Sequence, residues 1–292
     1  MTDLREVAVY LPPQRVAIAS LQDELALTDG QLRVFERFFG LSHIRREPGG
    51  TGYDLMLAAA GKLSELRGQE DRIRYVIQAR TMPVVTAYPR SDVHEVRRAL
   101  GLRRAEAFTI VHQACASGLL AVDLAGRLLA AEGDPDALAL ILTGEKTFTT
   151  AVKTVPGAAV NGEGAAALLV GIGGGHDRVL GYAARTYGRF NSGLGLTGDS
   201  TADFQQVYPN AVAEALLTAV DRAGISSVTW PWSCRTTSTA SPGCGCAGSS
   251  ASRWNASCWT TSRRPVTASA PTPSSISGRL RSSAGYSRAT GT

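Results

Sequence analysis

Hydrophobic and polar residues recur with two different periods along the first 225 residues, and this pattern predicts alternating strands and helices. Short apolar runs between polar or glycine residues are typical of buried strands, whereas apolar residues three or four positions apart are typical of helices. Strands are predicted at residues 6–11, 73–79, 107–113, 137–145 and 165–172, with a hairpin turn at 173–176. Helices are predicted at 21–39, broken at 28–30, and at 53–66, 92–100, 115–131 and 203–223. The alternation indicates an α/β protein.

The last 63 residues, called here the C-terminal tail (230–292), follow no such pattern. They contain 24 Ser or Thr but only three branched aliphatic residues, and no periodic core positions can be found. Seven of the 30 Lys and Arg lie in the tail and none of the 25 Asp and Glu, so residues 1–229 carry a net charge of −2. The overall net charge of +5 is therefore a property of the tail alone.

The overall composition is that of a chain with an ample core, since 44% of the residues are hydrophobic and 19% are charged. The longest apolar stretches, such as 165–172, are far shorter than the roughly 20 residues of a bilayer span. The start, MTDLREVAVYLP, lacks the basic and apolar regions of a secretory signal. We therefore expect a cytoplasmic protein without a membrane span, with its thiols reduced.

Cys115, in VHQACASGLLAVDLA, is the sharpest chemical feature of the sequence. The pattern places it at a tight turn where a strand ends and a helix begins. The free N–H groups and the positive dipole end of that helix then point at the sulfur, which favours a nucleophilic thiolate. Its small neighbours leave space for a substrate. A buried core cysteine accounts for the apolar flanks equally well.

Several motifs together resemble the thiolase superfamily, and within it β-ketoacyl-acyl-carrier-protein synthase III. ACASG around Cys115 is followed about 45 residues later by VNGEGAAALLVG, in which Gly162-Glu163-Gly164 matches the glycine-acidic-glycine step of that family. The resemblance covers most of residues 1–225. It includes FGLSHIRRE, TMPVVTAYPRSDVHEVRRALGL and VYPNAVAEALLTAVDRAGIS.

This resemblance implies a five-layered αβαβα sandwich of two similar halves, normally assembled as a homodimer. Residues 1–176 would form the half that carries the nucleophile, and residues 177–229 the start of the second half. Cys115 would take an acyl group from acyl-CoA or acyl carrier protein and pass it to a malonyl thioester or another acceptor. Coenzyme A and carrier-protein thioesters are then substrates, and no cofactor or metal is expected.

Arg45 and Arg46 are candidates for binding a coenzyme A phosphate or an acidic carrier protein, because guanidinium groups suit both. A solvated pair of loop arginines is an equally good interpretation. The synthase III resemblance also implies a histidine in a Pro-His-x-x-Asn segment and an Asn after a Gly roughly thirty residues later, and neither motif is present. His43, His94, His112 and His176 are predicted on a loop, a helix, the far side of a strand and a turn, so none is expected to replace it.

The C-terminal tail offers a reason for the missing motifs. When codons are read from their third base, Cys234 to Thr239 permits Pro-His-Asn-Val-Asn, and Pro265 to Thr267 permits Gly-Asn or Gly-His. Both motifs thus reappear about thirty residues apart. We therefore interpret residues from about 226 onward as a frame-shifted translation, and predict a disordered tail at 230–292.

Three classes of function follow from these observations. The first is an acyltransferase of the synthase III type that uses Cys115. The second is a catalytically inactive homologue or a damaged gene product that does not condense. The third is an acyltransferase core whose Arg/Ser-rich tail binds nucleic acid. The absence of Lys from the tail and its scattered Trp and Cys argue against the third class, so no nucleic-acid partner is expected.

Overall fold

The computed structural model describes residues 1–82, 90–111, 113–147, 153–155, 159–174, 177–190 and 198–225. Some predictions concern residues outside these ranges. They are the disordered tail, the frame-shifted translation from about 226, and the positions of His112 and His176. The described residues divide into two compact units, one at 1–179 and the other within 180–225. That these units correspond to two thiolase-like halves stays a prediction.

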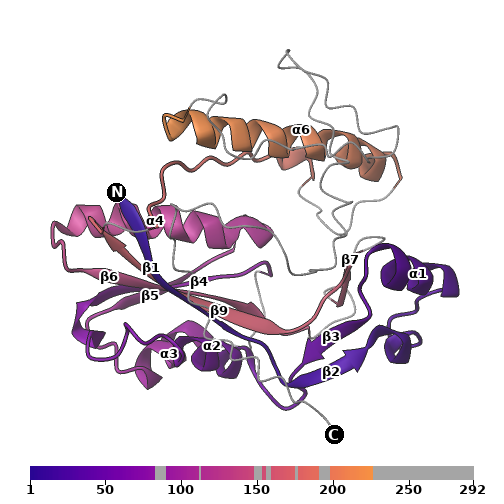
Figure 1. The fold of residues 1–292 in the computed structure, drawn as a ribbon, viewed down its shortest axis with the longest axis horizontal. Helices are drawn as coiled ribbons and strands as arrows, with labels where there is room; N and C mark the ends of the chain where they lie inside the picture. The colour runs from indigo at the N-terminus through magenta and orange to yellow at the C-terminus, as the bar shows by residue number, and fades with distance from the viewer. Residues whose placement is uncertain are drawn as a thin grey trace, which may run out of the picture. The chain divides into compact units, whose positions relative to one another are not determined.

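A mixed five-stranded sheet is the centre of the first unit, and its order is β1-β9-β6-β4-β5 (Figure 1). The strands are β1 (Thr2–Tyr10), β4 (Ile73–Ala79), β5 (Glu106–Ile110), β6 (Leu138–Glu145) and β9 (Gly164–Ile172). β4 runs parallel to both β5 and β6, whereas β9 is antiparallel to β6 and to β1. The carboxyl ends of β4, β5 and β6 therefore meet at one edge of the sheet.

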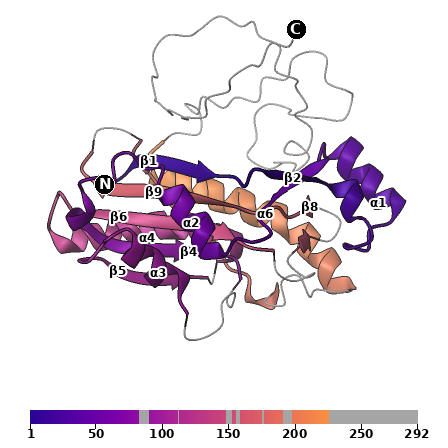
Figure 2. The ribbon, with the colours of Figure 1, turned by 90° about the horizontal axis from the view of Figure 1, so that it is seen from below.

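Helices cover both faces of this sheet. α2 (Gly52–Ala60) and α3 (Asp92–Ala99) lie on one face and α4 (Ser117–Glu132) on the other (Figures 1 and 2). α2 begins where Thr51 and Asp54 form a capping box, in which the Thr51 hydroxyl accepts the Asp54 N–H over 3.2 Å. α4 ends at Gly133, whose φ of 72° is left-handed.

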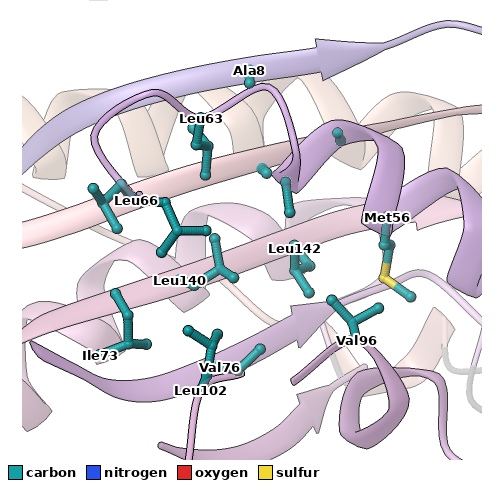
Figure 3. Packing of buried hydrophobic residues seen from close by; sticks show 14 of the residues in the cluster. Ala8, Met56, Leu63, Leu66, Ile73, Val76, Val96, Leu102, Leu140 and Leu142 are labelled. Atoms are coloured by element: carbon teal, nitrogen blue, oxygen red, sulfur yellow. The ribbon is translucent and has the colours of Figure 1, made fainter. Parts of the chain in front are cut away.

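Burial on both faces explains why β6 is a continuous apolar run instead of an alternating one. Leu140 and Leu142 pack into the core under α2 and α3, with Ile73 and Val76 of β4 (Figure 3). Ile141, between them, packs into the core under α4. Each of these five side chains is fully buried.

A second, smaller group of elements lies around two short antiparallel sheets. The sheets pair β2 (Gln14–Ala17) with β3 (His43–Arg46), and β7 (Thr154–Val155) with β8 (Ala159–Val160). The 3-10 helix Ile18–Leu21 follows β2, and α1 (Asp29–Arg33) continues into a π-helix at Val34–Phe38. Elsewhere in the described residues, short 3-10 helices are Glu70–Arg72, Ala114–Ala116 and Gly188–Phe190. Thr28 caps α1, because its hydroxyl accepts the Gln31 N–H over 3.2 Å. The predicted break at 28–30 is the start of this helix.

Three predictions about elements need correction. Residues 22–26 form turns where the first piece of a 21–39 helix was expected. The helix predicted at 53–66 ends at Ala60, because the chain turns at Gly61 and Leu63 is placed in the core by a tighter turn. After β9, Arg178 forms an antiparallel bridge with Asp3 of β1, so the described residues of the predicted 173–176 hairpin region pair with β1 and not with β9.

The described part of the second unit is α6 (Asp199–Arg222) with the segment 180–190. The helix predicted at 203–223 is confirmed and begins four residues earlier. Arg185 pairs with Glu214 at 2.7 Å, and Arg222 donates to the Tyr182 carbonyl over 2.8 Å. At Gly181 a side chain would collide with the carbonyl oxygen of Ala219, so only glycine fits there.

One helix of the described residues, Ala114–Glu132, is long and apolar enough to cross a membrane, although no span was expected from the sequence. Its Ala121, Ala125 and Leu129 are fully buried and pack against the central sheet. This packing identifies it as a core helix of the α/β unit.

Candidate active site

Cys115 lies in the connection between β5 and α4. Ala114, immediately before it, has a φ of 45°, which is unusual for a residue with a side chain, and residues 114–116 form a 3-10 turn. α4 begins at Ser117, and its capping residue, Ala116, has no side-chain acceptor for the first N–H groups. Cys115 is exposed with a free thiol. The predicted placement at a strand-to-helix turn is confirmed, and the alternative of a buried core cysteine is wrong.

The Cys115 sulfur has a hydrogen-bond donor from another strand. The hydroxyl of Thr81, which follows β4, donates to Sγ of Cys115 over 3.6 Å. Oε1 of Glu145, the last residue of β6, accepts the N–H groups of Thr81 and Met82 over 2.9 and 2.8 Å. Three parallel strands thus deliver these groups from their carboxyl ends, which is where open α/β sheets usually bind ligands.

Ser117 is a buried polar group beside the nucleophile. Its side chain is 1% exposed, and its Oγ has no hydrogen-bond partner among the described residues. Buried hydroxyl groups normally have a hydrogen-bond partner, so the Ser117 hydroxyl, two residues after Cys115, is an exception to this rule.

Directly after Glu145 comes a buried ion pair that the sequence did not reveal. Lys146 and Glu163 approach to 2.5 Å, and each side chain is 6% exposed. Glu163 also accepts the N–H of Glu47 over 2.7 Å and the hydroxyl of Thr147 over 3.2 Å. Burial raises the pKa of Glu163, but the hydrogen bonds from Lys146 and Glu47 outweigh it, so the pKa lies below its ordinary value.

Arg45 and Arg46 lie on β3, and both guanidinium groups are bound within the chain. Nη1 of Arg45 donates to the carbonyls of Pro12 and Pro13 over 3.1 and 2.9 Å. Arg46 forms two hydrogen bonds to Glu24, of 3.2 and 3.0 Å. Their proposed role toward coenzyme A or a carrier protein stays a prediction.

The two described histidines are remote in the chain from this connection. His43 is exposed on β3, with its Nδ1 at 3.0 Å from the hydroxyl of Ser42, and His94 is exposed on α3. Sequence reasoning missed Thr81 and Glu145. Thr81 comes two residues after the end of β4, and Glu145 is the last residue of β6. Their position at the carboxyl ends of parallel strands was the signal that could have identified them.

No protein-family model and no curated protein sequence matches the chain. Solved structures do match. The acyltransferase ChlB3 aligns with a TM-score of 0.64 at 16% identity, over 78% of this chain and 72% of that protein. The 3-oxoacyl-(acyl carrier protein) synthase III, FabH, of Pseudomonas aeruginosa PAO1 aligns with a TM-score of 0.59 at 20% identity, over 77% and 71%.

A third match is the HMG synthase of the curacin biosynthetic pathway in complex with its holo donor acyl carrier protein. The TM-score is 0.52 at 20% identity, and the alignment covers 76% of this chain but 54% of the synthase. The chain therefore spans about half the length of that enzyme. Together these matches show that the chain has the thiolase-like α/β fold of condensing enzymes and acyltransferases. The expected thiolase-like α/β fold class is confirmed for the described residues, whereas the five-layered arrangement of two halves stays a prediction.

Proposed function

We propose that the protein is an acyltransferase of the 3-oxoacyl-acyl-carrier-protein synthase III type, with Cys115 as the acyl carrier. The observation that carries this proposal is the exposed Cys115 thiol at the start of α4, with the Thr81 hydroxyl donating to its sulfur. A thiolate at this position has donors for its negative charge and an open path to a substrate. The thiolase-like fold supports the same chemistry.

In the first half-reaction, the Cys115 thiolate attacks the carbonyl carbon of an acyl thioester. The developing oxyanion is favoured by the positive end of α4. Collapse of the intermediate breaks the bond to the donor sulfur, which leaves as coenzyme A or carrier-protein thiolate and takes up a proton. The product is an acyl-cysteine thioester, and one thioester has been exchanged for another without any redox change.

In the second half-reaction, a nucleophile attacks the acyl-cysteine and regenerates the thiol. For a malonyl thioester, loss of carbon dioxide leaves an enolate whose carbon forms the new bond. The enolate oxygen needs donors, and the synthase III motifs that would supply them are absent from the printed sequence. We therefore assign acylation to the chain as printed and expect little condensation from it.

Acyl carrier protein is the proposed alternative donor to acyl-CoA, because the matching HMG synthase binds a donor carrier protein. A homodimer is also proposed. Within the described residues β5 is the terminal strand of the sheet and is paired on one side only, so a second copy could extend the sheet there. Light scattering should give twice the chain mass, and a monomer at assay concentration would count against the dimer.

The test of the function is acyl labelling of the full chain. Incubation with acetyl-CoA and longer acyl-CoA donors, followed by peptide mass spectrometry, should place the acyl group on the peptide that contains Cys115. Cys115→Ala should lose it, whereas Cys115→Ser tests for a slower oxygen ester. Labelling elsewhere, or none in a folded sample with several donors, would reject the proposal.

A further inference from the structure

We infer that Glu145 is a positioning residue, which sets the hydroxyl of Thr81 against the sulfur of Cys115. The inference deepens the proposed function and rests on Cys115 as the nucleophile. Glu145 acts on the sulfur indirectly. It binds the backbone of the turn that follows β4, and that turn carries Thr81. Thr81 itself touches the reacting atom and is therefore assigned as a catalytic residue.

The geometry at Glu145 holds the turn in orientation as well as in position. One carboxylate oxygen, Oε1, accepts two successive backbone N–H groups, those of Thr81 and Met82, over 2.9 and 2.8 Å. Two bonds from adjacent peptide units to one atom leave the turn little freedom to rotate. Hydrogen bonds to a carboxylate are also stronger than those between neutral groups. The backbone that carries Thr81 is thus held where its hydroxyl reaches Sγ of Cys115 at 3.6 Å.

The consequence for chemistry follows from the direction of the bond. A hydroxyl that donates to sulfur stabilises a thiolate more than a thiol, so its removal should make the sulfur a slower nucleophile. The negative charge of Glu145 has the opposite direct effect, since a like charge disfavours the thiolate. If Glu145 positions Thr81, removing Glu145 should disfavour the thiolate of Cys115. If its charge instead repels the thiolate directly, removing Glu145 should favour the thiolate, so the sign of the measured change distinguishes positioning from repulsion.

A purely architectural role for Glu145 is the competing interpretation, because its two bonds also join the end of β6 to the end of β4. Loss of that tie would lower the stability of the unit. It would not by itself shift the pH at which Cys115 becomes reactive. The pH profile of the thiol is therefore the readout that decides between the two roles.

The experiment measures iodoacetamide alkylation of the full-length chain between pH 5 and 10, read by mass spectrometry on the Cys115 peptide because the sequence has four other cysteines. Thr81→Val should slow alkylation near neutral pH by roughly tenfold, the effect of one lost hydrogen bond to a charged sulfur, and should move the midpoint of the pH–rate profile upward. Thr81→Ser keeps the hydroxyl and should restore the original midpoint. Glu145→Met, which lacks an acceptor, should raise the midpoint in the same direction.

Two further variants test that Glu145 acts through Thr81. Glu145→Gln keeps an oxygen acceptor but not the charge, so its midpoint should stay at or slightly below the original one and should not rise. Glu145→Met combined with Thr81→Val should behave like Thr81→Val alone. Glu106→Gln, at the amino end of strand β5 and so at the opposite edge of the sheet, is the matched control and should change nothing. Thermal unfolding confirms that each variant is folded, and Glu145→Leu, which also lacks an acceptor and a charge, replaces Glu145→Met if the latter is not.

A fall in the midpoint for folded Glu145→Met would show direct charge repulsion, and an unchanged midpoint would show an architectural role. Either result overturns the inference. Acyl labelling is not needed for this measurement. If the chain is never acylated but shows the predicted midpoints, the proposed function is rejected and the positioning role of Glu145 is kept. If the chain is acylated but the midpoints do not shift, the positioning role is rejected and the proposed function is kept.

Discussion

Lys146 and Glu163 form a buried ion pair of 2.5 Å immediately beyond Glu145, the residue that holds the Thr81 turn. The ammonium of Lys146 also donates to the carbonyl oxygen of Glu47, and the Glu47 N–H donates to Glu163. The pair therefore joins the segment after β6, the start of β9 and the segment after β3. Lys146 is also the next residue after Glu145, so the pair adjoins the candidate active site in the chain.

Removing one partner of this pair should be strongly destabilising. Glu163→Gln leaves the Lys146 ammonium buried without a counter-charge, and the expected loss of unfolding free energy is about 3–5 kcal/mol. Urea unfolding of the full chain measures it. The control is Asp123→Asn, which breaks an exposed pair with Arg127 one helical turn away and should cost less than about 1 kcal/mol. Equal losses for the two variants would contradict the prediction.

The same pair predicts how stability depends on pH. The folded pKa of Glu163 is held below its ordinary value of 4.5 by Lys146 and the Glu47 N–H despite burial. The unfolded chain therefore binds the proton first, so the stabilisation is complete above about pH 4.5 and is lost as the pH falls through the lower folded pKa. The difference in unfolding free energy between the unsubstituted chain and Glu163→Gln should shrink on acidification from pH 7 to 3. A difference that stays constant across this range would refute the prediction.

Gly144 should tolerate no side chain, because both its conformation and its surroundings require glycine. Its φ is 149°, and a Cβ would lie 2.7 Å from Cβ of Ala165 and 2.8 Å from the carbonyl oxygen of Gly164. Gly144→Ala should cost more than about 3 kcal/mol, the sum of a strained backbone and a collision. Gly133→Ala is the matched control, with a φ of 72° and no atom within 4 Å, and should cost about 1–2 kcal/mol. Equal costs, measured by urea unfolding, would show that the collision is relieved.

The sequence pattern predicted the sheet well because its central strands are long and apolar. The predicted 73–79 strand coincides with β4, and those at 137–145 and 165–172 differ from β6 and β9 by one residue. The turns were harder to predict. Residues 22–26 and 61–67 keep apolar positions at helical spacing, yet they place Leu25 and Leu63 in the core from turns. Hydrophobic periodicity indicates which residues are buried, but it does not determine whether a helix or a turn places them in the core.

The candidate site could be predicted only in part for a related reason. Cys115 was identifiable because a strand, a reactive residue and a helix follow one another in the sequence. Thr81 and Glu145 are 34 residues before and 30 residues after it, and the parallel pairing of β4 with β5 and β6 brings them together. Strand order is a tertiary property, which no local pattern of residues contains.

The proposed role of Arg46 toward a coenzyme A phosphate can be separated from its bonds to Glu24. Arg46→Ala should raise the acyl-CoA concentration for half-maximal Cys115 labelling by roughly tenfold, as expected for one lost charge-assisted contact. Acyl-pantetheine, which lacks the nucleotide phosphates, should label at an unchanged concentration. Arg127→Ala, on the exposed side of α4, is the control. An equal change for both donors would assign Arg46 to the structure alone, and the same comparison applies to Arg45→Ala.

The last prediction concerns condensation and the reading frame of the tail. Acylation requires the Cys115 thiolate and nearby donors, whereas decarboxylative condensation also requires donors for the enolate oxygen. The chain as printed should therefore be acylated without condensing malonyl-carrier protein. Sequencing the coding DNA should reveal a one-base shift near Ser226, beyond which the other frame encodes Pro-His-x-x-Asn near position 236 and Gly-Asn or Gly-His near 267.

Both forms are then assayed side by side with acyl-CoA, and with malonyl-carrier protein or a hydroxyl acceptor. The restored chain should transfer the acyl group onward, and replacing its new histidine by Ala should abolish condensation while Cys115 is still acylated. Comparing the two forms separates the effect of the enolate donors from that of the Cys115 nucleophile, because both forms share residues 1–225. If the other frame lacks these motifs, or if the printed chain already condenses efficiently, the frame-shift interpretation is wrong. The enolate donors would then have to lie within the printed chain.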